Sequence, residues 1–206
     1  MTFHKILLSF LILLISACAT APVKLTDYGQ GHWRAKALIK DLEQNRSYVV
    51  YLNFNAVKDE QARMDVSSAL GTGVASLVVG PKDVRYILFD SKRFYYGPSQ
   101  SSVMRPILAM PFDPRWIHNV LFEKPLVDKE WQCTRDQRGF IENCFDSATD
   151  TRIVWSARHG DRRSVVLEHP KASVQITFQS FQPKVEDRKN LFVLEAPEGY
   201  EKLRVR

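Results

Sequence analysis

The chain has 206 residues, of which 45% are apolar and 25% charged, the balance of a globular protein with a core rather than of a disordered or collagen-like chain. Its length suits one domain. The net charge is +6, from 29 Lys and Arg residues against 23 Asp and Glu. Since this excess is spread along the chain without a dense basic run, we expect no nucleic-acid partner.

Residues 1–17 have the features of a secretory signal peptide. Lys5 gives a positive start, and an almost unbroken apolar run extends from Ile6 to Ile15. Ten helical residues span about 15 Å, whereas the hydrocarbon core of a bilayer is about 30 Å thick. The segment is therefore too short for a membrane span and is interpreted as a cleaved signal.

The segment Ile15-Ser16-Ala17-Cys18 resembles the lipobox of bacterial lipoproteins, in which the cysteine thiol accepts a diacylglyceryl chain. It predicts cleavage before Cys18 and stable anchoring by acyl chains on that residue. The alternative is an ordinary signal cleavage within 19–21, with loss of Cys18. Residue 19 is Ala rather than Asp, which by the enterobacterial sorting pattern favours the outer membrane. We expect a lipid-anchored protein on the periplasmic face of that membrane.

After a lipidated tether at 18–31, a single domain is expected at 32–206. Ala35, Leu38, Ile39 and Leu42 recur at helical spacing and predict an amphipathic helix from residue 33 to about residue 45. The apolar period then changes to two, which predicts a meander of five antiparallel strands. These strands are expected at 48–54, 64–70, 75–79, 84–89 and 93–96.

The middle of the chain interrupts the strands. A short helix is expected at 101–110, and Asp113-Pro114 has the N-cap and first-turn proline of a second helix that ends near Phe122. Further strands are expected at 130–135, 140–145, 152–157, 163–168, 173–181, 191–194 and 202–205. The fold class is thus mainly β (α+β): about ten or eleven of these twelve segments are expected to form the sheet, together with three helices.

A long antiparallel sheet has an apolar face to cover, and the expected helices are too few to fill the inner side of a strongly curved sheet. We therefore expect an internal cavity, although a sheet that closes on itself would cover the face equally well. The candidate lining residues are apolar positions on the expected strands and helices, and the alternative is that they form an ordinary core. They are Phe54, Met64, Leu77, Phe89, Phe94, Trp116, Leu121, Trp155 and Phe178.

Cys133 and Cys144 are predicted to form a disulfide, because an oxidising compartment favours pairing. A two-residue turn at Arg138-Gly139 would place them opposite each other, whereas a three-residue turn with Gly139 in a bulge would place them on opposite faces. The disulfide therefore predicts an even-numbered loop. The alternative is a redox or metal pair, but the spacing does not match Cys-x-x-Cys.

The turn at 158–163 (RHGDRR) is strongly basic. It is interpreted either as a grip for a phospholipid headgroup or an acidic partner, or as a solvated hairpin. The sequence contains neither Gly-x-Ser-x-Gly nor His-Glu-x-x-His, and its five histidines are not spaced like metal ligands. We therefore expect no enzyme activity, no metal and no cofactor.

Three segments resemble LolB-like outer-membrane lipoproteins of the LolA/LolB superfamily. Residues 68–77 (SALGTGVASL) resemble the proline-leucine-glycine turn between two strands, with Ala69 in place of the usual proline. Residues 83–122 have the family's order of two strands, a short helix and a proline-led helix with tryptophan. Residues 192–200 (FVLEAPEGY) resemble the terminal strand and Pro-x-Gly turn. The paired cysteines are not expected in LolB.

This resemblance implies a strongly curved antiparallel half-barrel with a helical lid and a lipid-binding interior. It further implies a monomer that binds acyl chains of lipids or lipoproteins and transfers them to the outer membrane, with a periplasmic LolA-like carrier as partner. Leu70 and Gly71 would form a membrane-insertion loop; otherwise Leu70 ends an apolar strand face with Met64 and Val66. The alternative function is a non-enzymatic envelope adaptor that binds a protein partner and has no ligand cavity.

Overall fold

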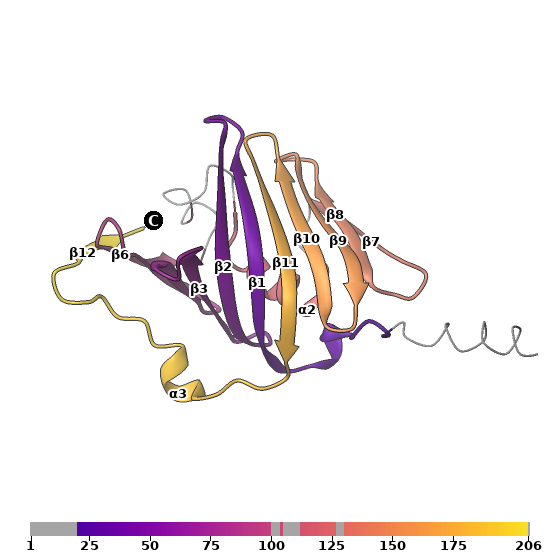
Figure 1. Ribbon diagram of the computed structural model, residues 1–206, viewed down its shortest axis with the longest axis horizontal. Coiled ribbons are helices and arrows are strands. Elements are labelled where there is room, and N and C mark those ends of the chain that lie inside the picture. The colour runs from indigo at the N-terminus through magenta and orange to yellow at the C-terminus, as the bar shows by residue number, and fades with distance from the viewer. Residues whose placement is uncertain (1–19, 100–103, 105–111, 127–129, 206) are drawn as a thin grey trace, which may run out of the picture.

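The computed structural model describes residues 20–99, 104, 112–126 and 130–205 (Figure 1). Within these residues, twelve strands form one sheet in the order β12-β6-β5-β4-β3-β2-β1-β11-β10-β9-β8-β7. All neighbouring strands are antiparallel except β12 and β6. The mainly-β prediction is confirmed, with one strand more than the expected maximum. The predicted signal peptide, Cys18 and nearly all of the helix predicted at 101–110 lie outside the described residues.

The first half of the sheet is a continuous meander of six strands. A 3-10 helix, η1 (Leu25–Asp27), precedes it. Its strands are β1 (Gln30–Asp41), β2 (Arg46–Val57), β3 (Gln61–Ser68), β4 (Gly73–Val79), β5 (Asp83–Leu88) and β6 (Arg93–Pro98).

The second half begins with α2 (Trp116–Phe122), the helix predicted after Asp113-Pro114. Its strands are β7 (Trp131–Arg135), β8 (Ile141–Asp146), β9 (Thr151–His159), β10 (Arg162–His169) and β11 (Ala172–Gln182). The chain continues through α3 (Arg188–Leu191) to β12 (Glu201–Arg204).

The helix predicted from residue 33 is wrong, because this segment forms strand β1. Trp33, Ala35 and Ala37 alternate inward and are at most 1% exposed, whereas Arg34 and Lys36 are exposed. β1 pairs with β2 along one edge and with β11 along the other, so it joins the two halves of the sheet. Two sheet edges satisfy its backbone groups, and this tertiary pairing overrides the helical spacing of the apolar residues.

The sheet has a large core on its inner face. Figure 1 shows the sheet bent, with α2 on this side. Trp33, Phe54, Trp155 and Phe178 from the strands pack in the same buried cluster as Leu121 from α2. The helix therefore covers part of the apolar face of the sheet.

A smaller core lies on the outer face of β4–β6. Val78, Ile87 and Phe94 pack there against Phe192 and Leu194 of the C-terminal segment. The strand predicted at 191–194 is therefore wrong, because these residues follow α3 in an irregular segment. Their alternating apolar side chains cover a sheet face without joining the sheet.

Residues 20–31, predicted as part of a tether, are attached to the domain. The Val23 N–H donates to the Gly160 carbonyl at 2.8 Å, and the Gly160 N–H donates to the Thr20 carbonyl at 3.3 Å. Leu25 is 2% exposed and belongs to the inner core. Residues 20–31 thus contact the domain that was predicted to begin at residue 32. Among the described helices, none has the length and apolar character needed to cross a membrane.

Candidate functional site

Leu70 lies at the tip of the turn between β3 and β4 and is 94% exposed. The Ser68 N–H donates to the Thr72 carbonyl at 2.8 Å, and the Gly71 N–H donates to the Ser68 carbonyl at 3.0 Å. Gly71 has φ +82°, in the left-handed region that glycine adopts without steric cost. This tight turn holds Leu70 away from the core, so the alternative in which Leu70 continues the buried face of β3 does not hold.

Other exposed apolar side chains lie at the same end of the sheet as Leu70. The β1–β2, β3–β4 and β5–β6 turns are at the same end of the sheet. Val50, near the start of β2, lies opposite Ser68 at the end of β3, and Ala75, near the start of β4, lies opposite Leu88 at the end of β5. Of the large exposed apolar side chains in the described chain, all but Tyr96 and Val193 belong to these hairpin ends. We call this group the apolar end: Leu42, Tyr48, Val49, Tyr51, Leu70, Val74 and Phe89.

The structure brings most of the predicted lining residues together, but packed rather than around a space. Six of them are at most 7% exposed in the inner core, with Met64 partly buried against them. These six are Phe54, Leu77, Trp116, Leu121, Trp155 and Phe178. Phe94 belongs instead to the outer core, and Phe89 is 37% exposed and belongs to neither core.

Two hollows of the described chain lie elsewhere. One, of about 230 Å³, is lined by residues of the β8–β9 and β10–β11 turns: Phe145, Asp150, Arg152, Glu168, His169 and Pro170. The other, of about 90 Å³, lies beside η1 and is lined by Lys24, Thr26, Asp27, Glu123, Arg135, Gly139, Phe140 and Ile141. Neither hollow contains a predicted lining residue.

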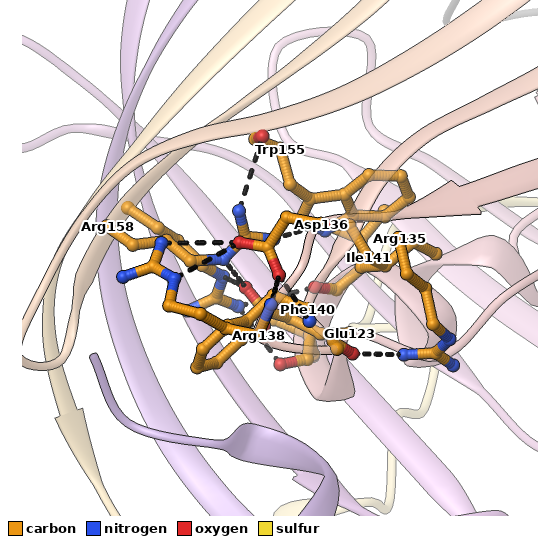
Figure 2. A network of polar contacts seen from close by, with 12 residues as sticks. Glu123, Arg135, Asp136, Arg138, Phe140, Ile141, Trp155 and Arg158 are labelled. Carbon is orange, nitrogen blue, oxygen red and sulfur yellow. Dashed lines mark hydrogen bonds and ion pairs between the residues drawn. The ribbon is translucent and has the colours of Figure 1, made fainter. Parts of the chain in front are cut away.

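The smaller hollow adjoins a buried polar network (Figure 2). Glu123 Oε1 lies 3.2 Å from Arg158 Nε and 3.4 Å from Arg163 Nε, and the three side chains are 4%, 8% and 2% exposed. Two guanidinium groups thus share one carboxylate, which leaves an excess of one positive charge under the helix. Burial of charge in such surroundings is costly unless hydrogen bonds offset it.

Arg163 is held from several sides. Its Nη2 donates to the Val120 and Leu121 carbonyls of α2 at 3.3 and 3.0 Å, and its guanidinium carbon lies 3.9 Å from the centre of the Phe178 ring. Its Nη1 has no hydrogen-bond partner among the described residues. Burial lowers the pKa of Arg163 to about 10, which the charge of Glu123 opposes. Arg163 therefore connects α2 to β10 and β11.

Local backbone features place these side chains inward. The register of β9 and β10 shifts beside Ala157, which has φ +51°, and this bulge brings Arg158 to the inner side instead of Ala157. Arg163 lies on the same strand face as the buried Val165. Glu123 ends α2 with φ +52° in the left-handed conformation. The alternation along β10 could have indicated that Arg163 faces inward like Val165. Nothing in the sequence indicated that Glu123 is buried beside it.

The basic turn at 158–163 is therefore divided between two environments. Arg158 and Arg163 are inside and pair with Glu123, while His159 and Arg162 are exposed. The interpretation as a solvated hairpin is thus wrong for Arg158 and Arg163. The acidic group with which they pair is Glu123 of the same domain.

The predicted disulfide between Cys133 and Cys144 is present. The even-numbered loop is wrong: the Asp136 N–H donates to the Phe140 carbonyl at 2.8 Å across a turn in which Gly139 has φ +82°. A register shift next to Thr134 compensates for this turn and brings the two cysteines back opposite each other. Within the described residues, no group of three or more His, Cys, Asp and Glu side chains is placed to hold a metal.

No family model and no curated protein matches the sequence. Among solved structures, the chain is similar to a LolA superfamily protein from Nitrosomonas europaea, with a TM-score of 0.53, 6% identity and coverage of 80% of this chain and 90% of that one. A DUF1329 family protein from Desulfovibrio piger gives a TM-score of 0.53 at 10% identity, covering 82% and 91%. A putative outer membrane lipoprotein-sorting protein domain from Vibrio parahaemolyticus gives 0.48 at 9%, covering 80% and 89%. The similarity to the Nitrosomonas europaea structure shows a LolA-like fold.

Proposed function

We propose that this protein is an envelope lipoprotein anchored through an acylated Cys18 at the periplasmic face of the outer membrane. It binds acyl chains of lipids or lipoproteins and takes part in their transfer to that membrane. The observation that carries the proposal is Leu70, 94% exposed at the tip of a tight turn in a LolA-like fold. The Cys133–Cys144 disulfide supports an oxidising compartment such as the periplasm.

The apolar end supports contact with acyl chains. A single exposed leucine needs no explanation, but a group of such side chains at one end of a sheet is typical of an interaction surface. Leaving a leucine in water rather than burying it forgoes about 1.5–3 kcal/mol. An acyl chain or lipid surface that covers Leu70 would recover part of this free energy.

The bent sheet with α2 on its inner side is interpreted as an open half-barrel with a helical lid. Its inner core is filled by the chain's own side chains in the described residues. An acyl chain therefore enters only if inner side chains or α2 move aside. In this proposal transfer runs from weaker to tighter binding of the acyl chain.

A second candidate function is favoured by the same filled interior. An envelope adaptor would use the outside of the domain to bind a protein partner and would need no space inside. The two functions differ in whether the purified protein carries a lipid.

Mass spectrometry of the full chain under native conditions separates these candidates. A co-purified lipid or acylated peptide supports the carrier, and a mass without ligand favours the adaptor. A denaturing spectrum of the same sample measures whether Cys18 is acylated.

Leu70→Glu tests the role of the β3–β4 turn. Because Leu70 is exposed, we expect a stability change within about 0.5 kcal/mol but slower transfer of lipid or lipoprotein to liposomes. Val193→Glu is the matched control, since Val193 is 51% exposed and lies outside the apolar end. Unchanged transfer by Leu70→Glu, or equal slowing by both variants, contradicts the proposed role of the turn.

A further inference from the structure

The N-terminal segment leaves the domain beside the turn between β9 and β10. Two backbone hydrogen bonds, from Val23 to Gly160 and from Gly160 to Thr20, attach it there. Figure 1 shows this indigo segment at the end of the sheet away from the β1–β2 turn. Consecutive Cα atoms are about 3.8 Å apart, so the lipidation site at residue 18 is at most about 8 Å from Thr20.

Leu70 lies at the opposite end of the sheet. Four residues lie opposite one another in a row across neighbouring strands: Arg163 of β10, Phe178 of β11, Ala35 of β1 and Leu52 of β2. Positions along the strands are counted from this row.

Gly160 lies three residues beyond this row in one direction. In the other direction, Val50 lies two residues beyond the row and opposite Ser68, and Leu70 lies two residues beyond Ser68. Gly160 and Leu70 are therefore seven residues apart along the strand direction, or about 23 Å. Leu70 and the lipidation site are thus far apart along the strands.

Among the described residues, no large exposed apolar side chain lies on the N-terminal segment or on the β7–β8 and β9–β10 turns, in contrast to the apolar end. Exposed basic side chains lie on the segment itself and on the β7–β8 and β9–β10 turns; we call Lys24, Arg135, Arg138 and Arg162 the basic end. Figure 2 shows Arg135, the last residue of β7, and Arg138 of the β7–β8 turn beside the buried network.

Three acidic side chains lie among these cations. They are Asp27, Asp136, which pairs with Arg138 at 3.2 Å, and Asp161, which accepts a hydrogen bond from the Phe181 N–H. Four exposed cations against three carboxylates give an excess of one positive charge. The Glu123, Arg158 and Arg163 network adds another.

We propose that the basic end is the surface on which the domain sits on anionic lipid headgroups of the membrane that holds its anchor. This inference rests on the proposed lipidation of Cys18. The short chain between the acyl group and Thr20 keeps this end at the membrane, and its excess positive charge complements anionic headgroups. The apolar end then points away from the anchoring leaflet, toward a lipid-bearing partner in the periplasm. In this orientation Leu70 contacts acyl chains carried by that partner and does not insert into the leaflet that holds the anchor.

Fluorescent labels at the two ends test this orientation. The acylated full chain, with its disulfide intact, is placed in phosphatidylglycerol-containing vesicles with a headgroup-attached spin label. Gln137→Cys on the β7–β8 turn and Ala69→Cys beside Leu70 are each labelled with an environment-sensitive dye. We expect at least three-fold stronger quenching at position 137 than at position 69. Equal quenching, or stronger quenching at 69, overturns the orientation.

Charge reversal tests the role of the basic end. Arg138→Glu with Arg162→Glu should at least halve the quenching at position 137. The matched control is Lys40→Glu with Arg46→Glu, two exposed residues by the β1–β2 turn, which should leave the quenching unchanged. An equal effect of both pairs refutes headgroup contact at the basic end. A mass without acylation would instead refute the anchoring on which the proposal rests.

Discussion

Replacing Glu123 by Gln removes the carboxylate that Arg158 and Arg163 share. Both arginine side chains are at most 8% exposed, so they cannot recover full hydration after the change. Removing one partner of a buried ion pair typically costs about 3–5 kcal/mol. In a chain of this size, 1 kcal/mol shifts the thermal midpoint by about 2–4 °C, so we expect Glu123→Gln to lower it by about 6–20 °C.

Arg163→Met should cost less, although it removes a larger group from the same network. The remaining Glu123 and Arg158 have balanced charges. The substitution loses hydrogen bonds to the Val120 and Leu121 carbonyls, about 1.5–3 kcal/mol for a charged donor. It also removes the free-energy cost of burying the charged Arg163 side chain, the same burial that lowers its pKa to about 10. This cost is of the same order as the lost hydrogen bonds. We expect a net change within about 2 kcal/mol.

Thermal or urea unfolding of the oxidised protein measures these differences. Glu142→Gln is the control, because Glu142 is exposed on β8 and its change should stay within about 0.5 kcal/mol. The reasoning fails if Glu123→Gln is no more destabilising than Glu142→Gln. It also fails if Arg163→Met costs more than Glu123→Gln, because charge balance would then not decide the stability of the network.

Burial lowers the pKa of His118 below its ordinary value of 6.5. As the pH falls below about 6.5, the unfolded chain is therefore protonated at His118 before the folded chain, and the free energy of unfolding should decrease. Urea unfolding at pH 5 and pH 7 should show a smaller difference for His118→Gln; an unchanged difference contradicts the assignment. Cys133 and Cys144 should resist alkylation until reductant is added, whereas rapid labelling of the untreated native protein would show free thiols. Cys18→Ser should remove the protein from outer-membrane fractions, and unchanged fractionation would refute lipid anchoring.

The secondary structure was predictable from the sequence where the apolar residues fit a single periodicity, either two for a strand or 3.6 for a helix. Val174, Ile176 and Phe178 of β11 alternate with Gln175, Thr177 and Gln179, and the structure has a strand there. In β1 the same residues fitted a period of 3.6 through Ala35, Leu38 and Ile39 and a period of two through Trp33, Ala35 and Ala37. Only the edges offered by β2 and β11 decide between them.

The β3–β4 turn was identifiable because Leu70-Gly71 follows an alternating strand, but its exposure depends on the conformation of the turn. The Glu123 network was not identifiable, because Glu123 is 35 residues from Arg158 and meets it only when α2 packs on the inner face of the sheet. The bulge at Ala157 that turns Arg158 inward is likewise a property of the paired strands.

The sequence by itself determined the mainly-β class, the order of most elements, α2 and the pairing of two cysteines, since each depends on local period, capping or a short separation along the chain. Tertiary structure alone decided that β1 joins the two halves of the sheet, that Phe94 and Phe192 pack on the outer face, and that the N-terminal segment and Leu70 lie at opposite ends. These features depend on contacts between residues far apart in the chain. Their free energy comes from apolar area and backbone groups that are removed from water only when the whole sheet is assembled.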